Sequence, residues 1–486
     1  MRMRPLLLMP LVALALAGCG SSSSGSNAND ARRTEYSYFP AGTPFVMSLA
    51  TDPIAASIKK AQALEGRFPL AAFGQSALMS KLSQLGINYQ SDIRPLFGNP
   101  ITIGATTPTL SGSASKQFLV TWVTKDASKL TALVKKIPGV RASGSHDGAT
   151  LYAIGASATA AVSGATLVFA PEAAIVNAAL DRHAQGSGVS SAEVARETSG
   201  LPQDTLLETF GNLSTVLSMP TAAKARRIPW VAAFRGYGAA ISATTSGVTF
   251  RYHLDTSGGS LTPSQLPFAP GSAAPSLIST APISVGIHDP AQIFAFVEGA
   301  EQASNPAKYA AFLRRQAAVK SKSGVDLNGF LKLLTGDLVL ASDTHTTIGR
   351  VAVSNPAAAA DVLSKLVANP SGLFAKATAV KKLAGGVYAF KETKRTIDVG
   401  VIGNQFVAGN TGPAQLRAFA VAPATPAAGA QGAVAFRVGL SQVLHLALKH
   451  APPKIVQTIL ASLGDITGWS SASANGIDGS ATLAIR

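Results

Sequence analysis

The residues that could carry out chemistry are few and scattered along the chain. Cys19 is the only cysteine among the 486 residues, and there are seven histidines: His146, His183, His253, His288, His345, His445 and His450. His445 and His450 are five residues apart on a predicted helix, which is off the i, i+4 spacing that places two metal ligands on one face. We therefore expect no metal site, no disulfide framework and no Cys-based zinc site.

Three weaker candidates have simple structural explanations. His253 and Asp255 share one face of a predicted strand, where they either pair or face water. Asp289 is expected to cap the helix that follows it, rather than to work with His288. Gly236-Tyr237-Gly238 lacks the third glycine of the dinucleotide fingerprint and is expected to form a bend before a hairpin.

Known catalytic motifs are absent from the sequence. It has no Gly-x-Ser-x-Gly elbow, no His-Glu-x-x-His helix and no Gly-x-x-x-x-Gly-Lys phosphate loop. The acidic residues total only 25, and they include no close carboxylate pair suited to acid–base catalysis. We expect no enzyme, no catalytic residue and no cofactor. Because triads are assembled in space, a hydrolase remains the last-ranked alternative.

The N-terminus has the pattern of an export signal. Arg2 and Arg4 precede a short apolar run from Leu6 to Leu16, which is too short to span a membrane. Leu16-Ala17-Gly18-Cys19 resembles the lipobox of bacterial lipoproteins. That resemblance implies that residues 1–18 are a signal peptide cleaved before Cys19, whose thiol carries a diacylglycerol with acyl chains such as palmitate. The alternative is a plain secretory signal with an incidental cysteine.

Residues 19–37 are predicted to comprise the lipidated cysteine and a flexible tether that follows it. Residues 20–27 are almost entirely serine and glycine and offer nothing to bury. No other run of 18 apolar residues follows, so the lipid on Cys19 would be the only anchor. We therefore expect an extracytoplasmic lipoprotein whose membrane contact is made through Cys19.

The net charge of +16 is spread along the chain, and its densest cluster is Lys224, Arg226 and Arg227. Such an excess favours anionic partners, such as lipid headgroups or envelope polymers. A nucleic-acid partner is not expected, because no aromatic interleaving or binding motif accompanies the charge. Nothing in the sequence indicates a particular protein partner.

The body of the chain shows signs of an internal repeat. We predict two α+β repeats, over residues 38–262 and 263–486, joined near a segment rich in Pro, Gly and Ser at 261–275. Motifs recur in the same order in the two halves: Asp52-Pro53 with Asp289-Pro290, Gly86-Ile87-Asn88 with Gly324-Val325-Asp326, Leu151-Tyr152 with Val387-Tyr388, Val162 and Gly164 with Val401 and Gly403, Leu213-Ser214 with Leu440-Ser441, and Ser246-Gly247 with Asn475-Gly476. The alternative is that two Ala/Gly/Val-rich halves resemble each other by composition alone.

Short apolar runs separated by tight turns, such as the one at Gly403-Asn404, predict strands. A helix is predicted after the capping residue Asp126. Residues 248–254 alternate apolar with polar, which predicts a strand whose Phe250 face is buried and whose Asp255 face is wet. Consecutive strands joined by short turns favour antiparallel pairing. The predicted fold class is α+β, a tandem duplication of an antiparallel-sheet module with helices packed on one face.

Several of these segments are similar to one known family. Tyr38-Phe39-Pro40-Ala41-Gly42-Thr43-Pro44, the Asp52-Pro53 pair and residues 201–206 resemble bacterial proteins catalogued as domain of unknown function 3352. The resemblance implies exported or membrane-attached α+β proteins, common in actinobacteria. It implies no activity, cofactor or site residue.

The sequence is consistent with two functions. The first is a non-enzymatic, lipid-anchored binding or scaffold protein of the cell envelope. The alternative is a carrier of a lipid or another hydrophobic ligand. A cavity of several hundred cubic ångströms between sheet and helices would favour the carrier, and a filled core would favour the scaffold.

Overall fold

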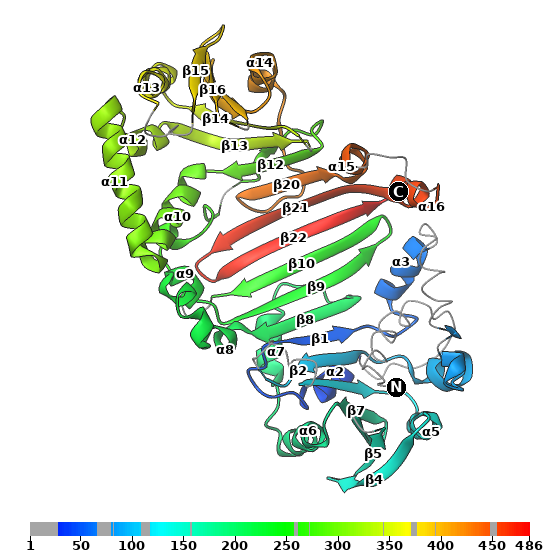
Figure 1. Cartoon of the computed structure of the whole chain (residues 1–486). Helices are drawn as coiled ribbons and strands as arrows, with labels where there is room; N and C mark the ends of the chain where they lie inside the picture. Colours follow the sequence, from blue (N-terminus) through cyan, green and yellow to red (C-terminus); the bar gives the residue numbers. More distant parts are fainter. Residues whose placement is uncertain are drawn as a thin grey trace. The chain divides into compact units, whose positions relative to one another are not determined.

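Antiparallel strands with helices between them make up most of the structure (Figure 1). The computed structural model describes residues 28–65, 79–80, 82–107, 117–155, 158–256, 261–271, 273–343, 345–370, 377–393, 395–447 and 454–486. Within these ranges, no helix combines the length and apolar character needed to cross a bilayer. The predicted α+β class and antiparallel sheet are confirmed.

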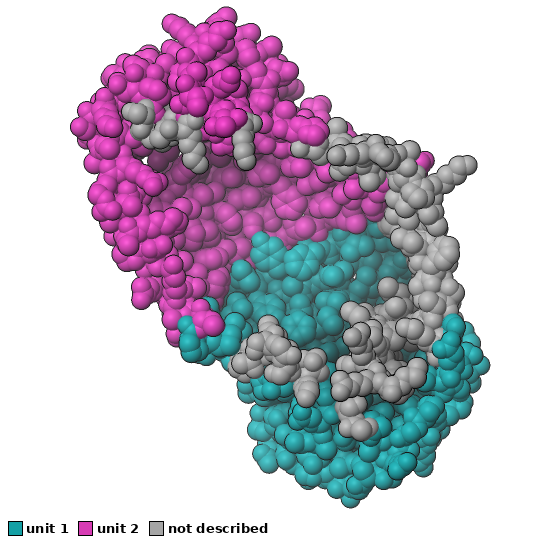
Figure 2. Space-filling view, in the orientation of Figure 1, with its two compact units in different colours: residues 1–220, 235–255, 484–486 teal, residues 221–234, 256–483 magenta. Residues whose placement is uncertain are grey.

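The chain forms two compact units, coloured separately in Figure 2. Unit 1 comprises residues 1–220, 235–255 and 484–486, and unit 2 comprises residues 221–234 and 256–483. The main boundary between the two units therefore lies at residues 255–256, whereas the predicted repeat boundary lies at 262–263. The short segment 221–234 departs from the predicted division, because it belongs to unit 2.

The sheet of unit 1 has the strand order β10-β9-β8-β1-β2-β3-β7-β6-β5-β4, with every neighbouring pair antiparallel. Its strands are β1 (Val46–Leu49), β2 (Ile101–Ala105), β3 (Phe118–Val123), β4 (Val140–His146), β5 (Ala149–Ile154), β6 (Ala158–Ser163), β7 (Thr166–Ala170), β8 (Leu207–Asn212), β9 (Gly236–Thr244) and β10 (Gly247–Asp255).

The helices of unit 1 begin where the sequence supplies caps. Asp126 accepts a hydrogen bond from the Lys129 amide at the start of α5, which confirms the predicted cap. The helical segments are α2 (Ala28–Tyr36), α3 (Ala56–Glu65), η1 (Tyr89–Ile93), η2 (Arg94–Leu96), α5 (Ala127–Lys136), α6 (Ala173–Gln185), α7 (Ser191–Glu197) and α8 (Leu213–Leu217).

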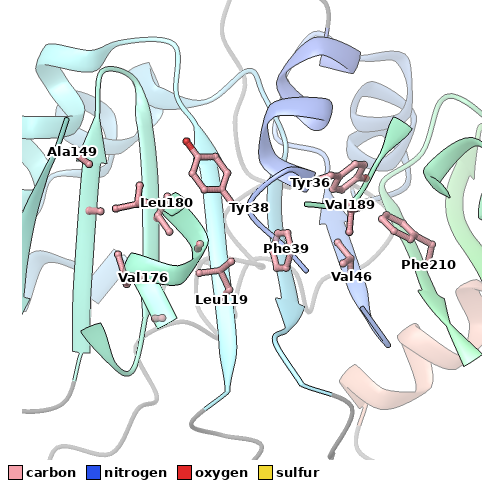
Figure 3. Close-up of a cluster of buried hydrophobic side chains, with 14 residues drawn as sticks. Tyr36, Tyr38, Phe39, Val46, Leu119, Ala149, Val176, Leu180, Val189 and Phe210 are labelled. Carbon is pink, nitrogen blue, oxygen red and sulfur yellow. The ribbon is translucent and has the colours of Figure 1, made fainter. Parts of the chain in front are cut away.

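Helices cover both faces of this sheet, so the prediction of helices on one face is wrong. Ala160 packs in the cluster that contains Leu130 of α5. Ala161 packs instead in the cluster that contains Val176 and Leu180 of α6, shown in Figure 3. Neighbouring strand residues point to opposite faces. The strands β3 and β6 are apolar at consecutive positions, and this lets them bury both faces.

The predicted tether differs from the structure at its C-terminal end. Residues 28–36 form α2, and Tyr36 is buried against Phe210, with ring centroids 5.0 Å apart (Figure 3). Glu35 is also fully buried. From Ala28 onward the segment therefore belongs to the folded part of unit 1.

The sheet of unit 2 has the order β22-β21-β20-β12-β13-β14-β18-β17-β16-β15, and β11 pairs separately with β19. Its strands are β11 (Ser276–Leu277), β12 (Ile283–His288), β13 (Leu334–Ser342), β14 (Thr347–Val353), β15 (Ala379–Lys382), β16 (Val387–Lys391), β17 (Thr396–Ile402), β18 (Gln405–Gly409), β19 (Thr425–Pro426), β20 (Val434–Gly439), β21 (Leu463–Ser473) and β22 (Gly476–Ile485).

Unit 2 also has helices on both faces of its sheet. Leu363 of α13 packs with Val399, whereas Leu416 of α14 packs with Val407 on the other face. The helical segments are η4 (Pro220–Ala222), η5 (Ala225–Arg227), α9 (Pro229–Ala232), η6 (Pro263–Gln265), α10 (Pro290–Ser304), α11 (Pro306–Ser323), α12 (Leu327–Leu331), α13 (Pro356–Ala368), α14 (Pro413–Val421), α15 (Leu440–Ala447) and α16 (Lys454–Ser462).

The two sheets have the same strand order when each is followed from β1 or β12. The hairpin of β6 and β7 pairs Val162 with Leu167, and that of β17 and β18 pairs Val401 with Phe406. Each hairpin turns on a glycine with positive φ, Gly164 at 54° and Gly403 at 60°. Because order and hairpin register agree, individual positions of the two sheets can be compared.

Candidate functional site: an apolar cavity in unit 2

A cavity of about 430 Å³ lies over the sheet of unit 2, in the size range typical of small-molecule sites. Its walls come from α10 and from strands β13, β14, β17 and β18. The lining residues are Pro290, Phe294, Leu334, Leu338, Leu340, Thr347, Gly349, Arg350, Val351, Arg395, Ile397, Phe406, Ala408, Gly409 and Asn410.

The floor of the cavity is made of small side chains on paired strands. Gly349 of β14 lies opposite Leu340 of β13 and Ala408 of β18. A Cβ atom added at Gly349 would lie 2.7 Å from Leu340 Cδ2, so only glycine leaves Leu340 in place there. The next pair on this face is Val351 and Phe406.

The side wall on α10 is apolar and reaches solvent. Phe294 lines the cavity and has 45% of its surface exposed. In the floor of the cavity, the ring of Phe406 meets that of Phe330 edge-on, with centroids 5.2 Å apart.

Polar groups stand at the rim. The Asn410 amide oxygen accepts a hydrogen bond from the Thr347 backbone amide at 2.6 Å. Arg395 Nε donates to Glu392 Oε2 at 2.9 Å, while 62% of the Arg395 side chain stays exposed. Arg395 therefore keeps donors that a ligand can reach.

Arg350 lines the cavity but directs its guanidinium elsewhere. Its Nη1 donates to the Phe419 and Ala420 carbonyls at 2.6 and 3.0 Å, and the guanidinium lies over the Phe419 ring. These partners belong to α14, on the other face of the sheet. Burial lowers the pKa of Arg350. The cavity is therefore apolar inside, with its accessible positive charge at Arg395.

A buried carboxyl in unit 1 was not anticipated from the sequence. Glu35 Oε2 accepts a hydrogen bond from Thr102 Oγ1 at 2.6 Å, and Oε1 accepts one from the Val123 amide at 2.9 Å. Burial raises the pKa of Glu35 to about 8, against the lowering effect of these bonds and of Arg32. These contacts fix α2 on strands β2 and β3.

A second buried acidic pair corrects two sequence predictions. Asp255 is buried and Phe250 is 42% exposed, so the predicted faces of β10 are wrong. Arg196 donates to the buried Glu197 at 2.6 Å and lies 3.9 Å from Asp255. Gly236-Tyr237-Gly238 lies within β9 rather than in a bend. Both glycines pack against Glu197, where an added Cβ atom would overlap it.

His146 has two acidic neighbours. His146 Nε2 lies 2.6 Å from Asp181 and 3.8 Å from Asp147, and this is where the described residues could offer three ligand atoms to a metal. All three side chains are at least 32% exposed. No pattern in the sequence links them, because Asp181 is 35 positions from His146.

The other predicted positions have mixed outcomes. His288 pairs with Asp337 at 2.8 Å, and Asp289 makes no side-chain capping bond, so its predicted cap is wrong. With φ at 46°, Asp289 has a left-handed backbone that is not that of an ordinary N-cap. Cys19 and the predicted signal peptide lie outside the described residues, as does His450.

Comparison with known proteins places the chain in a family. The profile of the family described as "Protein of unknown function (DUF3352)" matches residues 7–356, which is well over half of the chain. The chain belongs to the DUF3352 family. The match includes the strands β1 to β10 of unit 1 and the part of unit 2 that supplies α10, β13 and β14 to the cavity.

Beyond the DUF3352 family, the similarities are distant. No curated protein matches the chain. The structure described as "Structure of crystal form III of TP0453" has a TM-score of 0.27 and 9% identity, over 47% of this chain and 82% of that one. Crystal form I of the same protein gives a TM-score of 0.27 and 8% identity, over 47% and 80%.

Proposed function

We propose that the protein is a non-catalytic, lipid-anchored binding protein of the cell envelope. The observation that carries this proposal is the apolar cavity of unit 2, which has the size of a ligand site and has no titratable pair suited to acid–base chemistry in its lining. The export pattern at residues 1–19 and the family membership support the location.

The two units are proposed to be copies of one ancestral module. Their common strand order supports this, as does the identical placement of the two glycine hairpins. A further parallel lies before β2 and β13, where Asn88 and Asp326 each accept backbone hydrogen bonds at a helix start. Each follows a glycine with positive φ, Gly86 or Gly324.

A carrier of a hydrophobic ligand is the second candidate function, and the apolar lining of the cavity is the observation that supports it. A scaffold needs only a filled core and a contact surface. The 430 Å³ space has apolar walls and an exposed Phe294 at its edge, as expected of a site that accepts a hydrocarbon.

Ligand extraction tests this function. The full chain is isolated from membranes in a mild detergent that does not displace bound lipid. It is then expected to release a non-covalently held lipid into organic solvent. Mass spectrometry of the extract would give about one molecule per chain, above a blank made from an unrelated lipoprotein purified the same way. A folded protein that yields no lipid and binds no fatty-acid probe would contradict the carrier function.

The anchor is tested by the Cys19→Ala variant. Because the acyl chains would be the main hold on the membrane, the variant is expected to leave the membrane fraction after a high-salt wash. It should also lose radiolabelled palmitate incorporation. Retention of the washed variant on membranes to the wild-type extent would show that Cys19 is not the anchor.

A further inference from the structure

The cavity of unit 2 corresponds to a filled region in unit 1. The two sheets can be aligned through the hairpins, where Val162 pairs with Leu167 and Val401 with Phe406. In unit 1, Leu167 of β7 also pairs with Trp122 of β3. In unit 2, Phe406 of β18 pairs with Val351 of β14. Trp122 and Val351 therefore hold the same place in the two sheets.

Continuing along these strands gives four positions where unit 2 has the smaller side chain. The adjoining pair is Val120 with Phe169 in unit 1 and Gly349 with Ala408 in unit 2. The four positions are Phe118, Val120, Trp122 and Phe169 in unit 1, against Thr347, Gly349, Val351 and Ala408 in unit 2. All four of the smaller residues line the cavity.

The larger residues of unit 1 fill the same space with a packed aromatic core. Trp122 is 4% exposed, and its ring lies 5.6 Å from that of Phe97. The rings of Phe118 and Phe169 lie 6.1 Å apart in the same cluster. Three positions have the larger side chain in unit 2: Phe406, Val399 and Ile397 stand where unit 1 has Leu167, Ala160 and Ala158. The Phe406 ring contacts Phe330.

We propose that unit 2 is the ligand-binding unit and that its ligand is a single hydrocarbon chain with an anionic head group. The four exchanges remove side-chain volume on one face of one unit only. The inner wall offers no charged side chain, which favours a hydrocarbon over a polar ring. This inference rests on the proposed binding function and specifies its ligand.

The head group is assigned to the rim at Arg395. Its guanidinium is mostly exposed and uses Nε for Glu392, so its remaining N–H groups can bind a carboxylate or phosphate. The Thr347 and Asn410 side chains line the same cavity. A fatty acid and a lysophospholipid share this chemistry, and binding measurements with each distinguish the two sources.

The test fills the cavity of unit 2 in the full chain by introducing the larger residues found at the matching positions of unit 1. Ala408→Phe and Thr347→Phe each place in unit 2 the aromatic residue of the matching unit 1 position. Binding is measured by the fluorescence of cis-parinaric acid, and separately with a lysophospholipid that carries the same chain. Each variant is expected to weaken binding at least 10-fold. The matched control Ala360→Phe, on the exposed face of α13, should bind like wild type.

The head-group assignment has its own comparison. Arg395→Gln is expected to weaken binding of the acid about 5- to 10-fold but to leave binding of a long-chain alcohol unchanged. Arg417→Gln, another exposed arginine of unit 2, should change neither. Equal effects of Arg395→Gln on the acid and the alcohol would overturn the anionic assignment.

The possible failures are distinguishable. If both filling variants fold and bind the probe as wild type does, the ligand lies outside this cavity, although the protein still binds lipid. If one variant does not fold, the other decides, since Thr347 is exposed at the rim and tolerates added volume. If folded wild type binds neither probe, the proposed function fails together with this inference.

Discussion

Replacing Glu35 by glutamine is expected to remove a strong pH dependence from the stability of the protein. The carboxyl is fully buried, and its pKa is raised from 4.5 to about 8, with burial as the largest cause. Glutamine has nearly the same shape and can still accept the hydrogen bond from the Val123 amide. Unlike the protonated carboxyl of Glu35, the glutamine amide does not ionise in this pH range.

The sign of the effect follows from linkage. The folded pKa lies above the unfolded one, so the folded state holds a proton that the unfolded state has released between pH 4.5 and about 8. The stability from this group is complete below pH 4.5 and declines as pH rises to 8. At about 1.4 kcal/mol per pH unit, the decline totals roughly 5 kcal/mol.

Urea unfolding between pH 4 and 9, followed by circular dichroism, measures this effect. The wild-type free energy of unfolding should decline across the interval, and the Glu35→Gln curve should be flatter by most of that amount. Glu172→Gln is the matched control, because Glu172 is exposed and makes no capping bond. Parallel curves for wild type and Glu35→Gln would mean that Glu35 is ionised in the folded protein.

Local signals in the sequence predicted local structure well. Asp126 caps α5 because its side chain and the Lys129 amide are three residues apart, a distance that the sequence fixes by itself. The hairpin at Gly403-Asn404 likewise needs only the two strands that flank it. The same local patterns carried the resemblance to the DUF3352 family.

Features that depend on distant partners were missed or wrong. Glu35 follows a Ser/Gly segment and looks like solvated tether, but Thr102 and Val123, which bond to it, come much later in the chain. Asp255 looked wet by alternation, yet it lies near Arg196 in the fold. An alternating pattern gives the period of a strand and cannot say which face another element will cover.

The cavity is also a feature that depends on residues far apart in the sequence. Small residues at Gly349, Val351 and Ala408 are unremarkable in a chain with 45 glycines and an alanine-rich composition. Only the pairing of β14 with β18 places them on one face beside each other. Even then, the cavity is significant chiefly because the matching face of unit 1 is packed with aromatic rings.

Truncating Trp122 to alanine is expected to destabilise the protein by about 3–5 kcal/mol, the usual cost of removing a large buried aromatic side chain. Trp122 is 4% exposed and packs against Phe97 in a filled cluster that has little room to collapse. Its indole nitrogen has no hydrogen-bond partner within the described part of the chain, so the loss is one of packing.

The equivalent change in unit 2, Val351→Ala, should cost only about 1 kcal/mol, because Val351 already borders an open space and loses fewer contacts. Guanidinium unfolding followed by circular dichroism compares the two variants without relying on the tryptophan that is removed. Val351→Ala should also keep or increase the binding of a hydrocarbon probe, since it enlarges the cavity. If Trp122→Ala proved no costlier than Val351→Ala, the contrast between a filled unit 1 and a hollow unit 2 would be lost, and with it the reason for assigning the ligand to one unit.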